Sequence, residues 1–88
     1  MKIKPEYTLR FEEEGVSVVR VSPAGEVTPV SPISDTAAMA WEGFERGFSR
    51  PELAEAIVTE FGGVTREQVE QELDELAAQL IALGYAEE

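Results

Sequence analysis

The chain has 88 residues and a net charge of −11, and it contains neither cysteine nor histidine. A chain of this length makes one small domain, over residues 1–88, with little room for an enclosed active site, and it lacks the residues of disulfides, of most zinc sites and of the usual general base. We therefore expect no enzymatic activity, cofactor or metal, and the absence of any signal-like or membrane-spanning apolar run predicts a cytoplasmic protein with no membrane partner.

The first quarter of the chain predicts two paired strands. Residues 7–12, YTLRFE, alternate apolar and polar side chains, which is typical of a half-buried strand. Residues 16–21, VSVVRV, are rich in β-branched side chains, which favour strands. The turn residues Glu13-Glu14-Gly15 separate the two runs, so we expect an antiparallel hairpin.

A third, weaker strand is predicted over residues 26–31. Pro29 and Pro32 lack a backbone N–H, so this segment cannot be a fully bonded central strand and should lie at a sheet edge. Because successive N–H groups point to opposite edges of a strand, prolines three residues apart should remove one donor from each edge. An edge strand is also a place where a guest peptide can add a further strand.

Three helices are predicted in the second half. The first, over residues 35–46, begins after the N-cap Ser34 and carries Trp41 on its buried face. The second, over residues 50–61, begins with a capping box formed by Ser49 and Glu52.

The third helix, over residues 66–83, has the clearest signals. Thr65 and Gln68 form a capping box at its start, and Gly84 suits the left-handed position that ends a helix. Its apolar face is predicted to comprise Val69, Leu73, Leu76, Leu80 and Leu83. Three strands followed by three helices predict an α+β fold, like a winged helix-turn-helix, with a three-stranded antiparallel sheet covered on one face by the helices.

Four further residues of the last helix lie beside this apolar face. Ala77 and Ile81 share a sector with Glu70 and Asp74, at about 100° per residue. One interpretation is a wide core face, as globular helices often have. The other is one wall of a groove for a partner that is both apolar and basic.

The order and spacing of several short runs carry a family resemblance. These runs are Lys4-Pro5, Tyr7-Thr8-Leu9-Arg10, the segment from Ile33 to Trp41, Gly47-Phe48-Ser49, Glu52-Leu53-Ala54, Phe61, and Leu76, Leu80 and Gly84-Tyr85. Together they resemble the PqqD family, whose fold is shared by the RiPP recognition elements, the peptide-recognition domains of ribosomal-peptide modification systems. Ser34 stands where this family usually has asparagine, and both residues cap helices well.

The resemblance implies a non-enzymatic peptide chaperone. Such a domain binds the leader segment of a ribosomally made precursor peptide and presents it to a modifying enzyme, often a radical-SAM enzyme, as in biosynthesis of pyrroloquinoline quinone (PQQ). The leader lies as an added strand beside the third strand, and the third helix forms the other wall of the groove. Carried over by position, the implied peptide-binding residues are Glu26, Val27, Thr28, Val30, Ser31, Glu70, Leu73, Asp74, Ala77 and Ile81.

Charge decides against one alternative function. A helix-turn-helix could bind DNA, but the last helix has Arg66 as its only basic residue against five acids, and nucleic-acid affinity depends on basic side chains at phosphates. We therefore expect no nucleic-acid partner. An acidic protein–protein adaptor with another partner remains the alternative.

Overall fold

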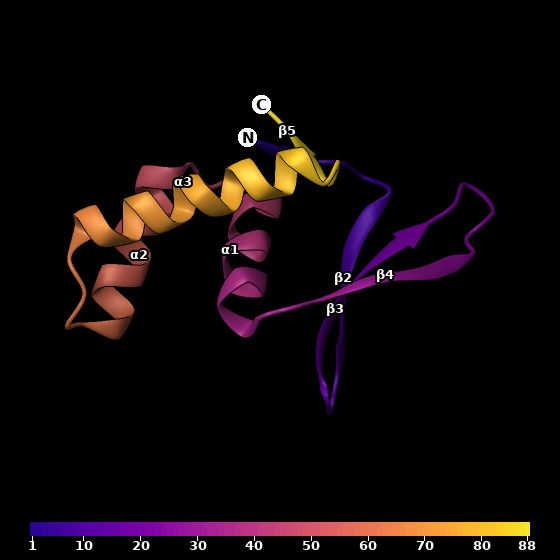
Figure 1. The fold of residues 1–88 in the computed structure, drawn as a ribbon, viewed down its shortest axis with the longest axis horizontal. Coiled ribbons are helices and arrows are strands. Elements are labelled where there is room, and N and C mark those ends of the chain that lie inside the picture. The colour runs from indigo at the N-terminus through magenta and orange to yellow at the C-terminus, as the bar shows by residue number, and fades with distance from the viewer.

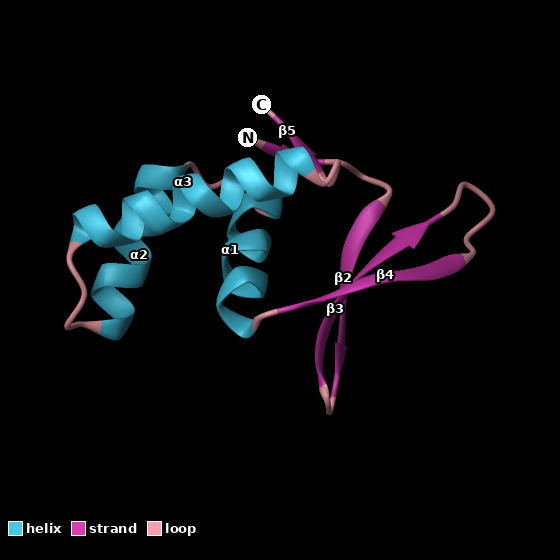
Figure 2. Cartoon of the chain, in the orientation of Figure 1, coloured by secondary structure: helices cyan, strands magenta, loops and turns pink.

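Three strands, three helices and a short strand near each terminus make up the computed structural model, which describes residues 1–88 (Figure 1). In chain order the elements are β1 (Lys2–Ile3), β2 (Tyr7–Glu12), β3 (Gly15–Val21), β4 (Val27–Ile33), α1 (Asp35–Glu45), α2 (Arg50–Phe61), α3 (Arg66–Ala82) and β5 (Ala86–Glu87). The predicted α+β architecture, an antiparallel sheet followed by three helices, is confirmed. Figure 2 shows the three-stranded sheet to one side of the helices, whereas the short terminal strands lie beside α1 and α3.

The main sheet has the strand order β2-β3-β4 and both pairings are antiparallel. β2 and β3 form the predicted hairpin, in which Tyr7 pairs with Arg20 and Glu12 pairs with Gly15. The third strand is longer than the predicted 26–31, because it extends through Pro32 to Ile33. The sheet meets the helices through β3, where Val18 is 1% exposed and packs in the core cluster.

The helices begin where the sequence indicates. Ser49 and Thr65 both make complete capping boxes, at the starts of α2 and α3. α3 ends in a Schellman motif, in which the Tyr85 N–H donates to the Leu80 carbonyl oxygen at 2.9 Å and Gly84 adopts φ +85°. Two helices are one residue shorter than predicted, because Arg46 and Leu83 serve as C-caps.

The terminal strands were not predicted. β1 pairs with β5, and the Lys4 N–H donates to the Tyr85 carbonyl oxygen at 2.9 Å. Two residues are too few to show the alternation by which a strand is recognised in a sequence. This pairing fixes the segment after α3 and brings the two chain ends together (Figure 1).

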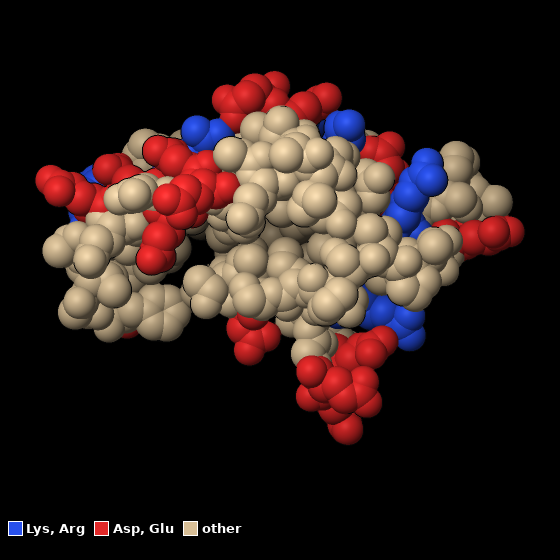
Figure 3. Space-filling model, in the orientation of Figure 1, with Lys and Arg blue, Asp and Glu red and all other residues tan.

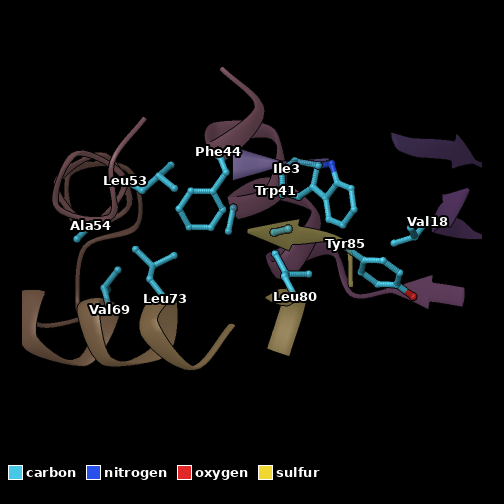
Figure 4. Packing of buried hydrophobic residues seen from close by; sticks show 12 residues of the cluster. Ile3, Val18, Trp41, Phe44, Leu53, Ala54, Val69, Leu73, Leu80 and Tyr85 are labelled. Atoms are coloured by element: carbon cyan, nitrogen blue, oxygen red, sulfur yellow. The ribbon is translucent and has the colours of Figure 1, made fainter. Parts of the chain in front are cut away.

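A single cluster of twelve buried residues lies between the helices, β3 and the terminal strands (Figure 4). Trp41 is fully buried in it, as predicted, and its ring lies 5.8 Å from that of Tyr85. Tyr85 also contacts Tyr7, with 5.0 Å between ring centroids. These aromatic contacts join β2, α1 and the end of α3 and so hold the sheet at a fixed position against the helices.

Candidate functional site

β4 is an outer strand of the sheet, and the register shows which of its residues face the open edge. The Val21 N–H donates to the Glu6 carbonyl oxygen at 2.8 Å, so Val21 faces β2 and not β4. Because neighbouring residues of a strand direct their N–H and C=O groups to opposite sides, Val19 and Ser17 also face β2. The β3 residues between them face β4, and their partners there are Thr28, Ser31 and Ile33.

Both prolines of β4 direct their ring nitrogens to the open edge. Pro29 pairs with Val19 and Pro32 with Ser17, which are the β3 residues that face away from β4. The register slips by one residue at a β-bulge that leaves Val30 unpaired, and this slip brings both prolines to the same side. The expectation that they remove one donor from each edge is therefore wrong.

A groove of about 250 Å³ runs between β4 and α3, and we call it the β4–α3 groove. β4 contributes Ser31, Pro32 and Ile33 to its lining. α3 contributes Leu76, Gln79 and Leu83. Leu83 is 62% exposed, so an apolar side chain of the last turn stands uncovered beside the sheet edge.

Tyr85 lines the groove and reaches across it to β4. Its hydroxyl lies 3.2 Å from the Ser31 hydroxyl, and either oxygen can be the donor. The pair links the end of α3 to β4 and so sets the separation of the two walls. Because each hydroxyl has more than one hydrogen-bonding position, the pair can still bind a polar group of a guest.

A larger pocket of about 500 Å³ lies among α1, α2 and α3, and we call it the three-helix pocket. Ser34, Ala37, Leu76 and Gln79 line both this pocket and the β4–α3 groove, so the two are continuous. The far wall carries the exposed side chains Met39, Phe61 and Val64. The result is one mostly apolar surface that begins at the sheet edge and ends beyond α2.

Apart from Glu72, the acidic side chains lie around this surface and not within it. Figure 3 shows a broad uncharged and hollowed area in the middle of the face, with acids gathered over the α2–α3 end and at the tip of the β2–β3 hairpin. Glu72 is the only charged residue that lines either pocket. An apolar guest segment with basic flanking residues would complement this arrangement.

The predicted residues of the third strand divide into two groups. Val27, Thr28 and Val30 lie on β4 and are exposed, and Ser31 lies in the β4–α3 groove. Glu26 precedes the strand, and its N–H donates to the Ser22 hydroxyl at 3.1 Å. Its position in the turn between β3 and β4 places it outside the groove.

The predicted residues of α3 do not line the β4–α3 groove. Ala77 is fully buried in the core, so its assignment to a surface wall is wrong. Leu73 is 4% exposed and contributes only to the three-helix pocket. Ile81 packs partly buried against the core cluster, as expected for the margin of the apolar face, but at the flank away from the groove.

The two acids of the predicted sector also lie on that other flank. Glu70 pairs with Arg66 at 3.3 Å, and Asp74 pairs with Arg50 at 3.5 Å, near the end of the chain. Arg50 also pairs with Glu88, beside β5. The sector therefore faces α2 and the terminal strands.

The prediction placed the groove on the other side of α3 because the apolar face of this helix has two flanks. Its buried centre comprises Val69, Leu73, Ala77 and Leu80, which places Leu76 and Leu83 on one flank and Ile81 on the other. Periodicity locates the centre but does not say which flank meets the sheet. One available signal was composition, because the flank with Leu76, Gln79 and Leu83 carries two leucines, whereas the flank of Ile81 also carries the acids Glu70 and Asp74.

The fold has solved counterparts, although neither a protein-family model nor a curated protein matches the sequence. A structure described as lasso peptide synthetase B1 complexed with the leader peptide is 23% identical, with a TM-score of 0.77 over 99% of this chain and 96% of that one. A second, described as TbiB1 in complex with the TbiA(beta) leader peptide, is 21% identical, with a TM-score of 0.74 over 97% and 93%. These values show a shared fold.

No group of three or more acidic, cysteine or histidine side chains has an arrangement that could hold a metal ion. None of the helices combines the length and the apolar character needed to cross a bilayer.

Proposed function

We propose that this chain is a peptide-binding domain of the PqqD type, a RiPP recognition element that binds the leader segment of a ribosomally made precursor peptide. The observation that carries the proposal is the open edge of β4 beside the apolar β4–α3 groove. An edge strand next to a groove can accept an extended peptide, with backbone hydrogen bonds on one side and pockets for alternate side chains on the other. The two structural counterparts, each solved with a leader peptide, support the same role.

The lining of the surface indicates the chemistry of the guest. Apolar side chains of the guest would enter the β4–α3 groove against Leu76 and Leu83, and the three-helix pocket would take a larger one against Phe61. Basic residues outside this apolar segment would be attracted by the net charge of −11. The bound peptide would thus be extended, apolar at its centre and basic at its ends.

In this proposal the domain performs no catalysis of its own, works in the cytoplasm and presents the peptide to a separate modifying enzyme. One of the two structural counterparts is described as lasso peptide synthetase B1. The sequence resemblance supports two finer parts of the proposal, namely that the modifying enzyme is a radical-SAM enzyme and that the pathway is PQQ biosynthesis.

The test begins with selection of a guest from a library of displayed random peptides, each long enough to span β4 and the groove. The tightest peptide is synthesised and titrated into the isotope-labelled full chain, and amide shifts are followed by NMR. We expect the largest changes along β4 and at Leu76, Gln79 and Leu83. Asp74 and Glu70, on the opposite flank of α3, serve as internal controls and should change little.

Two results would contradict the proposal. One is that no peptide is enriched over a surface without protein. The other is that the shifts are confined to the surface around Phe48, between α1 and α2, which would favour the alternative of an adaptor with a different docking surface.

A further inference from the structure

From Thr28 to Ile33 the open edge of β4 carries hydrogen-bond acceptors but almost no donors, whereas Val27, which pairs with Val21, directs its N–H outwards just before this segment. Thr28, Ser31 and Ile33 direct their N–H groups to β3, and the two prolines, which face outwards, have none. The carbonyl oxygens of Pro29 and Pro32 point to the same side as their ring nitrogens and remain available there. Apart from the bulged Val30, the edge from Thr28 to Ile33 can therefore accept hydrogen bonds but cannot donate them.

We propose that this acceptor edge selects the partner strand: it accepts a guest peptide that brings its own N–H groups and rejects a second copy of itself. The inference rests on the proposed function, because it names how the same site chooses its guest. It also has a part that does not depend on any peptide, which is the rejection of self-pairing.

A guest strand loses only part of the usual pairing at this edge. Opposite Pro29 and Pro32, its N–H groups donate to the proline carbonyl oxygens, while its own carbonyl oxygens find no donor and stay hydrated. Each of these positions then has one hydrogen bond where an ordinary strand pair has two. The affinity for the guest must depend more heavily on the apolar side chains in the β4–α3 groove, so the edge favours groove-filling sequences over any extended chain.

A second copy of the chain forms fewer hydrogen bonds at this edge than a guest peptide does. Two β4 edges that approach each other would bring proline carbonyl oxygens to proline ring nitrogens, and neither side supplies the N–H. An exposed edge beside an apolar groove would otherwise be a template for edge-to-edge association. The β-bulge is what turns both prolines to the open edge, because without the slip at Val30 one of them would face β3.

The experiment restores the missing donors with Pro29→Ala and Pro32→Ala, singly and together. Both prolines are exposed, so their replacement removes no core contact. Pro23→Ala, in the exposed turn between β3 and β4, is the matched control. Pro29→Thr and Pro32→Thr repeat the test with a residue that favours strands. The probe is the peptide selected from the displayed library.

We expect each edge substitution to tighten peptide binding by about two- to tenfold, which is the fold-change equivalent to one backbone hydrogen bond. The amide protons introduced at positions 29 and 32 should exchange freely with solvent in the free protein and become protected in the complex. The double variant should also sediment as a larger species than the wild type at the same concentration. The Pro23→Ala control should match the wild type in both measurements.

The outcomes separate the two proposals. If the peptide binds the groove but the substitutions leave its affinity unchanged, or if the new amides stay unprotected in the complex, the acceptor-edge inference is wrong and the proposed function stands. If the wild type self-associates as strongly as the double variant, the rejection of self-pairing is wrong. If no peptide binds any variant while the double variant alone associates, the rejection of self-pairing holds, and both the selection of a guest and the proposed function fail.

Discussion

Replacement of Leu83 by glutamine should abolish much of the peptide affinity and leave the fold intact. Leu83 is 62% exposed, so about two-fifths of its surface is already buried, and the change should cost at most about 1 kcal/mol of stability. The remaining surface would be covered by the guest. Its burial is worth about 1–2 kcal/mol, so we expect about 5- to 30-fold weaker binding.

Ile81→Gln is the matched control, because it makes the same type of change one half-turn away on the opposite flank of α3. Ile81 packs against the core and does not line the groove. It should therefore lose more stability than Leu83→Gln and retain wild-type affinity wherever it is folded. Calorimetric titration with the selected peptide measures affinity, and thermal unfolding measures stability. Each kcal/mol of lost stability should lower the thermal midpoint by about 4–8 °C.

One pattern of results would refute the reasoning. If Ile81→Gln weakens binding while Leu83→Gln does not, the guest lies along the flank that the sequence indicated, and the β4–α3 groove is not the site. An equal loss of peptide affinity in both variants, with no loss of stability in either, would also contradict the assignment of two unlike flanks.

Two further predictions concern the packing and capping that hold the walls of the pocket. Gly43→Ala should lower the free energy of unfolding by up to about 2 kcal/mol in urea, because overpacking against Leu53 outweighs the better helix propensity of alanine. In a Leu53→Ala background the same change should lose that cost. An undiminished cost there would contradict the clash. The pKa of Glu52 is lowered by the hydrogen bond from the Ser49 backbone N–H and then by that from its hydroxyl, so the stability that its charge contributes is present above the unfolded pKa and is lost as the pH falls through the folded value. The difference in thermal midpoint between wild type and Glu52→Gln should therefore shrink between about pH 6 and about pH 3, and a constant difference would argue against the linkage.

Local signals in the sequence were sufficient to predict the main strands, the helices and their order. Ser49 with Glu52 and Thr65 with Gln68 each make the expected reciprocal bonds, because a capping box involves only residues three apart. Trp41 is buried as its helical spacing indicated. Such features depend on a few neighbouring residues, and for this reason they can be read without knowledge of the tertiary structure.

The parts of the candidate site that were missed depend on contacts between distant segments. The flank of α3 that meets β4 is set by how the helix lies against the sheet, and Leu76 and Ile81 flank its buried centre alike. The bulge at Val30 is a property of the β3–β4 register, and Val30 itself carries no marker of it. Two prolines three apart were a local clue to it, because a regular edge strand would have turned one of them towards its only partner.

The last residues of the chain determine the width of the groove. Within three residues, Gly84 ends α3, the Tyr85 hydroxyl reaches Ser31 at 3.2 Å on β4, and Ala86 pairs with Ile3. Tyr85 is also held between two other aromatic rings, so it cannot move without disturbing the core. The separation of β4 from α3 is thus set before any guest arrives, which lowers the ordering cost of binding and allows a groove with few backbone donors to hold an extended chain.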